Sequence, residues 1–216
     1  MRSSRQRDQY SHCLRCFLRR EICICSLLPT VQTRTEFIIL QHVYESIRPS
    51  NTGRLVALAM PNSQIISCGG GNRIGLPLLD DGLLLNPATW LLWPDGPDKG
   101  SDIIESARPE RVVVLDATWQ QARRLYSRIA VLRTLPRLVL PAPAQQRKRL
   151  RKQHRSDGMS TIEAVAAALA KLEGRETAEP LEKLYDEVVR RKNAIRWGIR
   201  QSAAEDKEIV VSSSVL

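Results

Sequence analysis

One short apolar run, residues 112–115, limits the possible folds of this 216-residue chain more than any other stretch. Its residues, Val-Val-Val-Leu, are apolar without alternation, which predicts a strand buried on both faces of a parallel sheet. Asp116 ends the run, and Thr118 follows as a helix N-cap, with Gln121 completing a capping box three residues later. The sequence therefore predicts a buried strand, a tight turn that carries an acid, and a helix.

The acid and its neighbours predict a substrate site. In open α/β sheets, ligands bind at the edge where the carboxyl ends of the strands meet. Asp116, Thr118 and Trp119 would bring a carboxylate, a hydroxyl and an indole together at that edge, so we take them as the candidate catalytic residues. The alternative is structural, with Asp116 and Thr118 acting as caps and Trp119 packed in the core.

The other apolar runs predict the rest of the fold. Strands are expected at 36–41, 64–68, 90–94 and 136–141, and helices at 54–60, at 160–174 and from Pro180 to Gln201. Strands that alternate with helices indicate a mostly parallel α/β sheet. We expect a catalytic domain over residues 31–201, preceded by a small element at 1–30 and followed by a disordered tail at 202–216.

Four of the five cysteines cluster in the amino-terminal element, as Cys13 and Cys16 in a CxxC and Cys23 and Cys25 in a CxC. Four thiolates can complete a tetrahedral zinc shell, so the spacing predicts a structural zinc site. A catalytic zinc is disfavoured because four protein ligands leave no position for water. The alternatives are reduced thiols without a metal, or disulfides.

Charge points to a polyanionic partner. Lys and Arg number 33 against 23 Asp and Glu, a net charge of +10, which favours nucleic acid, with an anionic membrane as the second choice. A dense basic run lies between residues 145 and 155, on the same predicted edge as Asp116. The candidate RNA-binding residues are His42, Arg48, Arg54, Arg123, Arg147, Lys148, Arg151, Lys152 and His154.

The sequence carries no membrane or export signal. No apolar stretch approaches the roughly 20 residues that span a bilayer, and the first ten residues are polar and basic. We therefore expect a cytoplasmic protein. The sequence leaves the oligomeric state open, with a monomer preferred.

Five sequence blocks in order resemble the DTW-domain family, the tRNA-uridine aminocarboxypropyltransferases, and in particular its bacterial type. Asp116-Ala117-Thr118-Trp119 is similar to the motif that names the family. The other four blocks are the CxxC and CxC cysteines, Gln41-His42 with Glu45, Arg48 and Ser50-Asn51-Thr52, the Leu92–Pro94 turn, and Lys152-Gln153-His154 leading to Ser160-Thr161-Ile162-Glu163-Ala164. The resemblance spans roughly residues 13–170.

The resemblance implies a SPOUT-like α/β fold with a trefoil knot that binds S-adenosylmethionine. It also implies transfer of the 3-amino-3-carboxypropyl (acp) group to N3 of a tRNA uridine, in the variable loop, with release of 5′-methylthioadenosine. On this basis the candidate cofactor-binding residues are Leu92, Pro94, Leu115, Leu140, Pro141, Ser160 and Thr161. Leu92, Pro94, Leu140 and Pro141 suit an apolar adenine pocket, and Ser160 and Thr161, at a helix N-terminus, suit the donor carboxylate.

Two roles for Asp116 stay open. It is either the base that takes the N3 proton or the group that binds the ammonium of the donor. Thr118 would cap the helix, while Trp119 would pack against the donor or stack on a flipped uracil. Two other functions also remain: a knotted RNA methyltransferase that uses the same cofactor, and a zinc-containing RNA-binding module without catalysis.

Overall fold

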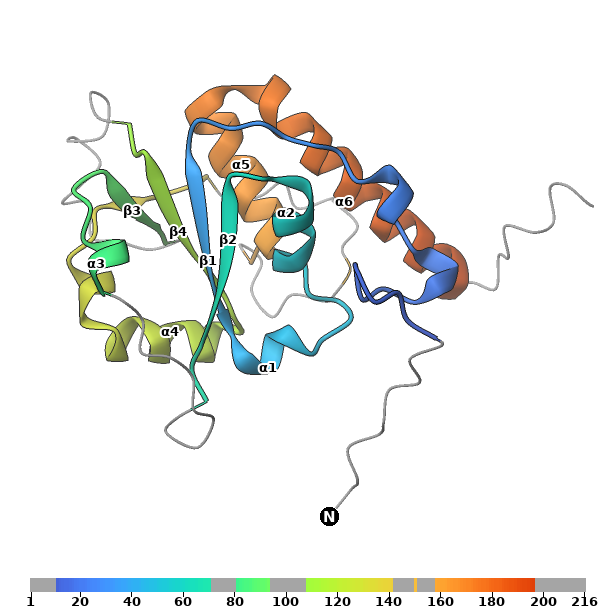
Figure 1. Ribbon diagram of the computed structural model, residues 1–216, viewed down its shortest axis with the longest axis horizontal. Helices are drawn as coiled ribbons and strands as arrows, with labels where there is room; N and C mark the ends of the chain where they lie inside the picture. The colour runs from blue at the N-terminus through green and yellow to red at the C-terminus, as the bar shows by residue number, and fades with distance from the viewer. Residues whose placement is uncertain (1–10, 71–80, 94–107, 142–149, 151–157, 197–216) are drawn as a thin grey trace, which may run out of the picture.

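A five-stranded parallel sheet forms the centre of the molecule (Figure 1). The computed structural model describes residues 11–70, 81–93, 108–141, 150 and 158–196. In the order of the sheet, the strands are β2 (Ser63–Cys68), β1 (Glu36–His42), β4 (Arg111–Asp116), β3 (Thr89–Leu92) and β5 (Arg137–Leu138). Each neighbouring pair is parallel, which confirms the predicted α/β sheet.

Helices cover both faces of this sheet. They are α1 (Val43–Ser46), α2 (Gly53–Ala59), α3 (Asp81–Leu84), α4 (Trp119–Arg128), α5 (Thr161–Glu173) and α6 (Arg175–Arg196). Single 3₁₀ turns occur at Arg20–Ile22, Cys25–Leu27 and Ala130–Arg133. Helices α2, α5 and α6 share one hydrophobic cluster with the sheet, and α4 shares the other, so the architecture has three layers.

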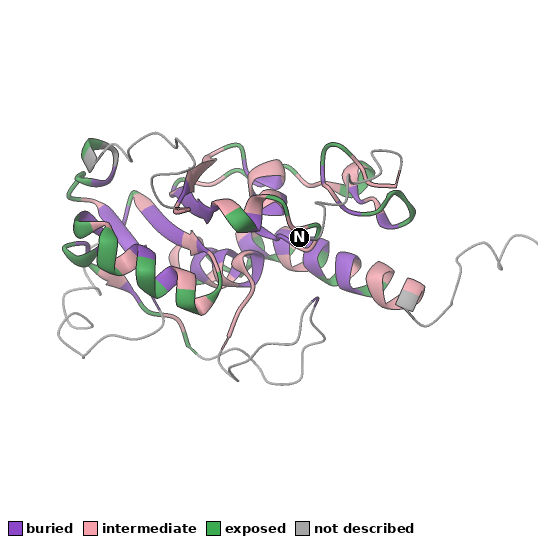
Figure 2. Cartoon of the chain, turned by 90° about the horizontal axis from the view of Figure 1, so that it is seen from below, coloured by how far each residue is buried: buried purple, intermediate pink, exposed green. Residues whose placement is uncertain are grey.

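Successive side chains of the central strands pack alternately into these two clusters. Phe37, Ile39 and Val112 are fully buried on the face that carries α2, α5 and α6. Ile38 and Val113 are fully buried on the face that carries α4. Figure 2 shows the buried colour along the strands and along the sides of the helices that face them. Burial on both faces explains why the strand at 112–115 shows no polar alternation.

The cysteine element belongs to the first of these clusters. Cys16, Leu18, Ile22 and Ile24 are buried there, together with residues of α2, α5 and α6. The guanidinium of Arg191, near the end of α6, donates to the backbone carbonyl of Cys23. The amino-terminal element therefore packs as part of the main core.

Two sequence predictions about element boundaries were wrong. Helix α6 begins at Arg175, five residues before Pro180, because Ala178 on its first turns is already buried against the core. A proline at that point removes one backbone hydrogen bond, which this packing offsets. The strand predicted at 136–141 contains only Arg137 and Leu138, flanked by residues such as Pro136 that have no N–H for the ladder.

Some expectations concern parts of the chain that lie outside the described residues. The connection between β5 and α5 includes 142–149 and 151–157, so the trefoil knot stays an expectation. The tail at 202–216 also lies outside them. Among the described residues, no helix is long and apolar enough to cross a membrane.

Candidate active site

The sheet has a switch point between β1 and β4. These strands are neighbours, but the chain leaving β1 runs to α2 on one face, whereas the chain leaving β4 enters α4 on the other. Such divergence opens a crevice at the carboxyl ends of the two strands, where α/β proteins bind ligands. Gln41 of β1 and Asp116 of β4 are paired in register at this position.

Asp116 is the centre of a buried hydrogen-bond network. Its side chain is only 3% exposed. Oδ2 accepts from Gln41 Nε2 at 2.9 Å and from Asn51 Nδ2 at 2.5 Å, and Oδ1 accepts from Thr161 Oγ1 at 2.6 Å. The carboxylate thus ties together β1, β4, the loop before α2 and the start of α5. Since a carboxylate offers about four acceptor positions, about one remains, on Oδ1.

The start of α2 is shaped to meet this carboxylate. Asn51 Oδ1 accepts from the backbone N–H of Arg54 at 2.9 Å, so Asn51 caps the helix while its amide nitrogen holds Asp116. At Gly53, any larger residue would force the surroundings to move, because its Cβ would lie 2.6 Å from Asp116 Oδ2. Glycine is therefore needed here for close approach of the backbone.

The start of α5 closes the site from the other side. Ser160 forms a capping box with Glu163, and its hydroxyl donates to Glu163 Oε2 at 2.7 Å. The hydroxyl of Thr161 is bonded to Asp116, and the N–H of Ile162 points to Thr52 Oγ1 at 3.4 Å. Of the two residues expected at the donor carboxylate, Thr161 lies at the centre of the site, and Ser160 is engaged within its own helix.

Thr118 and Trp119 lie on the other side of the sheet edge from the Asp116 network. Thr118 is exposed and forms the predicted capping box, accepting from the N–H of Gln121. Trp119 packs with the cluster of the α4 face, whereas Asp116 bonds to residues of the α2 and α5 face. Asp116 therefore approaches the sheet edge from one face and Trp119 from the other, and the shared role of the three side chains in one site stays a prediction.

Trp119 belongs to an aromatic stack that the sequence did not reveal. Its ring lies 5.4 Å from that of Trp93, which in turn lies 4.7 Å from the ring of Tyr126. The guanidinium of Arg123 lies 5.0 Å from the Trp119 ring, and Arg137 donates to the Tyr126 hydroxyl at 2.7 Å. Trp119 and Tyr126 are seven residues apart, two helical turns, and that spacing was the available signal.

The apolar residues expected to bind the cofactor lie on both faces of the sheet. Leu92 and Leu140 pack against the cluster of the α2 and α5 face, and Pro141 is exposed next to them in the chain. Leu115 instead packs on the α4 face, because it follows Val114 by one position and side chains alternate along a strand. Pro94 lies outside the described residues.

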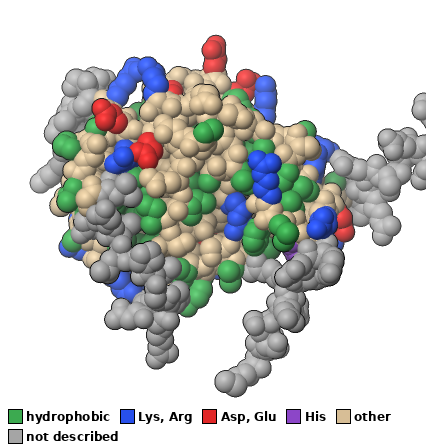
Figure 3. Space-filling view, viewed as in Figure 1, with side chains coloured by type: hydrophobic (Ala, Val, Ile, Leu, Met, Phe, Trp, Pro, Cys, Tyr) green, Lys and Arg blue, Asp and Glu red, His purple; other side chains and the backbone are tan. Residues whose placement is uncertain are grey.

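The described candidates for RNA contact are in different environments. Arg48 is 43% exposed and pairs with the buried Glu45 at 3.2 Å. Arg123 is exposed above Trp119, whereas Arg54 is partly buried against the cysteine element. The predicted contacts Arg147, Lys148, Arg151, Lys152 and His154 lie outside the described residues. Figure 3 shows basic side chains lying among hydrophobic ones on one face of the molecule.

His42 serves as a helix cap. Its Nδ1 accepts from the N–H of Tyr44 at 3.3 Å, and its ring is 8% exposed. Burial lowers the pKa of His42; nearby Glu45 opposes this shift, and Arg48 adds to it. A buried imidazole held neutral fits a structural role better than contact with phosphate.

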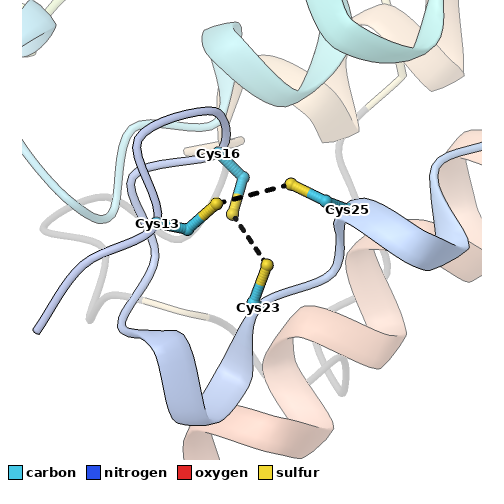
Figure 4. Close-up of side chains that lie close together, drawn as sticks. All are labelled: Cys13, Cys16, Cys23 and Cys25. Atoms are coloured by element: carbon cyan, nitrogen blue, oxygen red, sulfur yellow. Dashed lines mark hydrogen bonds between the residues drawn. The ribbon is translucent and has the colours of Figure 1, made fainter. Parts of the chain in front are cut away.

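The four clustered cysteines fit a tetrahedral metal ion. Their sulfurs point toward one another (Figure 4) and all lie within 4.8 Å of each other. The Sγ atoms of Cys13 and Cys25 are 3.6 Å apart, and those of Cys16 and Cys23 are 3.8 Å apart. Four sulfurs bound tetrahedrally to zinc, each about 2.3 Å from it, lie about 3.8 Å from one another. The cluster could therefore hold a metal such as zinc.

The remaining cysteine has different surroundings. Burial, and secondarily the charge of Asp116, raises the pKa of Cys68 to about 12, so its thiol stays protonated. Burial also acts on Cys13, but the N–H groups of Cys16 and Arg15 outweigh it and lower its pKa to about 6. The thiol of Cys68 is therefore protonated, whereas the pKa of Cys13 is lowered.

Fold and site together define a parallel α/β protein with a buried carboxylate at its switch point and a four-cysteine element in its core. Residues 10–193 match the family model described as the DTW domain, and the chain belongs to this family.

Three curated relatives have similar sequences and consistent names. The chain is 28% identical over 177 residues to tRNA-uridine aminocarboxypropyltransferase 2 of Drosophila melanogaster, covering 78% of this chain and 69% of that protein. It is 25% identical over 177 residues to the protein of the same name from Mus musculus, with 77% and 58% covered. It is 29% identical over 129 residues to tRNA-uridine aminocarboxypropyltransferase A of Arabidopsis thaliana, with 52% and 49% covered. The matched region thus spans between half and about two thirds of these relatives' lengths. No solved structure matched the chain.

Proposed function

We propose that this protein is a tRNA-uridine aminocarboxypropyltransferase that uses S-adenosylmethionine as donor. The observation that carries the proposal is the buried Asp116, the acid of the DTW motif, at the switch point of the sheet. The names of the relatives support the same activity. The net charge of +10 supports a polyanionic substrate such as tRNA.

The reaction forms a bond between uridine N3 and the γ-carbon of the acp group while the bond from that carbon to sulfur breaks. The electron pair of the broken bond passes to the sulfonium sulfur, giving the neutral thioether 5′-methylthioadenosine. The N3 proton passes to a base. Because the leaving group is neutral, no Lewis acid is needed, and the task of the protein is to bring the γ-carbon rather than the methyl group in line with N3.

Asp116 is proposed to bind the ammonium of the donor. Among the described residues, its hydrogen-bond donors Gln41, Asn51 and Thr161 are all neutral. A buried anion is stabilised most when a cation completes its surroundings, and about one acceptor position on Oδ1 remains for it. The other role, acceptance of the N3 proton, is the alternative that donor-binding measurements separate from this one.

Other residues are proposed to bind the adenine, the uracil and the structural metal. Leu92, Pro94, Leu140 and Pro141 are proposed to form the adenine pocket, within a SPOUT-like knotted fold. Trp119, stacked on Trp93 beside Arg123, is proposed to receive the flipped uracil, because stacking tolerates any base and Arg123 supplies positive charge for the backbone. Zinc is proposed as the structural metal of the cysteine cluster.

Substrate contact is proposed to extend over the basic residues around this edge. Charge removal at Arg151 and Lys152 is expected to weaken tRNA binding and leave S-adenosylmethionine binding unchanged, because each phosphate contact contributes a salt-dependent increment. The proposed site of modification is the variable loop, the proposed compartment is the cytoplasm, where tRNA is found, and the proposed state is a monomer.

The identity of the products tests this function. The protein is incubated with S-adenosylmethionine and unmodified tRNA, and the nucleosides and the donor product are measured by mass spectrometry. We expect 3-(3-amino-3-carboxypropyl)uridine together with 5′-methylthioadenosine. S-adenosylhomocysteine with a methylated base would instead make the protein a methyltransferase. Bound tRNA without either product would make it a binding module.

A further inference from the structure

Phe17 has a backbone conformation that its residue type disfavours. Among the described residues, it is the only non-glycine with a positive φ, at 60°. It lies in the turn of the CxxC, where its N–H donates to Cys13 O at 2.9 Å and Leu18 O accepts from Cys13 N at 2.8 Å. Glycine or asparagine adopts this conformation with less strain. Such strain persists where the surrounding structure imposes it, and it often marks a functional requirement.

The side chain of Phe17 supplies such a requirement. The guanidinium of Arg54 lies over its ring, 3.9 Å from the ring centroid, which is a close cation–π contact. Arg54 is on the first turn of α2, and its Nη2 also donates to the backbone carbonyl of Ser46 at 2.5 Å. Arg54 is therefore fixed on one side by the cysteine turn and on the other by the end of α1.

From Arg54 a short series of contacts reaches the candidate active site. The backbone N–H of Arg54 donates to Asn51 Oδ1 at 2.9 Å. The amide nitrogen of the same Asn51 donates to Asp116 Oδ2 at 2.5 Å. Direct contacts through Phe17, Arg54 and Asn51 thus connect the cysteine turn to the Asp116 carboxylate.

We propose that Phe17 and Arg54 are positioning residues through which the metal-bound cysteine turn holds Asn51, and so Asp116, in place. The metal fixes the turn, the turn fixes the Phe17 ring, and the ring fixes the first turn of α2. The claim that this affects catalysis rests on the proposed function. The mechanical coupling between the cysteine turn and α2 does not, and it is tested separately.

Hydrogen exchange of the full-length, zinc-loaded protein tests the coupling. Phe17→Gly removes the ring and suits a positive φ, so the turn should keep its shape and its zinc. Phe17→Tyr keeps the ring. Leu14→Ala is the matched control, because Leu14 lies in the same turn and its side chain is 73% exposed. Zinc content is measured by mass spectrometry for every variant, alongside exchange of the backbone amides of residues 47–60.

We expect Phe17→Gly to retain its zinc and to exchange about fivefold faster over residues 47–60, the change that loss of one cation–π contact supports. Zinc-free wild-type protein should show the same acceleration, while Phe17→Tyr and Leu14→Ala should match zinc-loaded wild type. Unchanged exchange in Phe17→Gly, or in zinc-free wild type, would overturn the proposal. Loss of zinc from Phe17→Gly would also overturn it, because Phe17 would then be needed for the cysteine turn itself.

Turnover separates positioning from a purely structural role. In Phe17→Gly, kcat should fall while the KM for tRNA stays near the wild-type value, and Phe17→Tyr should restore kcat. Equal behaviour of Phe17→Gly and Leu14→Ala in kcat would remove the catalytic part of the proposal. If no variant and no wild-type protein transfers the acp group, the proposed function fails, and the exchange result still decides whether the coupling exists.

Discussion

At the scale of single residues, the neutral surroundings of Asp116 predict that its negative charge contributes to binding of the donor. Asp116→Asn keeps the shape of the side chain, and the Thr161 hydroxyl can turn to accept from the new amide. The variant should therefore fold, but it should bind S-adenosylmethionine at least about tenfold more weakly, because a charge-assisted hydrogen bond to the donor ammonium is lost. Titration calorimetry with the donor, together with thermal melting, measures both effects.

Asp186→Asn, at an exposed position on α6, is the matched control for removal of one negative charge. It should leave donor affinity unchanged. If Asp116→Asn binds the donor normally and still loses turnover, Asp116 is the base that takes the N3 proton and the ammonium assignment is wrong.

Gly53 makes a second prediction at this scale. In Gly53→Ala, the new Cβ would lie 2.6 Å from Asp116 Oδ2 and 2.9 Å from its Cγ, and three hydrogen bonds keep that carboxylate from moving away. The start of α2 must shift, at a cost of about 1–3 kcal/mol in the free energy of unfolding. Urea denaturation measures this cost. Alanine ordinarily stabilises a helix relative to glycine, so a gain in stability would show that the contact is not tight.

Single residues were predictable from the sequence where the signal is local. The Thr118 capping box and the cysteine cluster follow from spacings of a few residues. The partners of Asp116 were not predictable in this way, since Gln41, Asn51 and Thr161 are separated from it by 75, 65 and 45 positions. Only the register of β1 against β4 and the docking of α5 bring them together.

At the scale of elements, the last turns of α6 predict a dependence on pH. Hydrogen bonding from Arg190, opposed by burial and reinforced by Arg191, lowers the pKa of Glu187 from 4.5 to about 2. A carboxyl group with a lowered pKa in the folded state stabilises the protein above its unfolded pKa, and this contribution is lost as the pH falls through the folded pKa. The melting temperatures of wild type and Glu187→Gln should therefore differ most at about pH 6, and the difference should shrink below about pH 4.5 and vanish as the pH approaches about 2.

Glu179→Gln is the control for this experiment. Glu179 pairs with Lys183 on the same helix, but the pair is largely exposed, so its loss should change the melting temperature little. A difference between wild type and Glu187→Gln that does not change with pH would contradict the electrostatic explanation.

The predictability of whole elements follows their length and burial. β1, β4 and α5 were predicted within one or two residues, because continuous burial or a capping box marks them. Helices α1 and α3 contain four residues each, which is too short for a periodic pattern. The start of α6 depends on packing against α5, and a proline within the sequence misled the prediction.

At the scale of the whole molecule, the position of the cysteine element predicts the effect of metal removal. Cys16 and Ile24 are almost fully buried in the core shared with α2, α5 and α6. Without a metal, the four sulfurs lose the bonds that hold this part of the core, so chelation should lower the melting temperature by roughly 5–10 °C. Differential scanning calorimetry before and after zinc removal measures the shift.

Cys68→Ala is the control, since Cys68 lies on the other face of the sheet and should not affect zinc content. Complete zinc removal with no change in the melting temperature would show that the cysteine element is held by its packing alone.

The contact between Arg191 and the carbonyl of Cys23 has a consequence for how the protein is made. The two residues are 168 positions apart, so the first structural element of the chain leaves the ribosome long before the helix that covers it. During synthesis, the thiols of this element stay exposed until α6 emerges and docks. Early binding of zinc would protect these thiols from oxidation until α6 docks. Growth in a zinc-poor medium is therefore expected to lower the amount of folded protein more than the amount of chain synthesised.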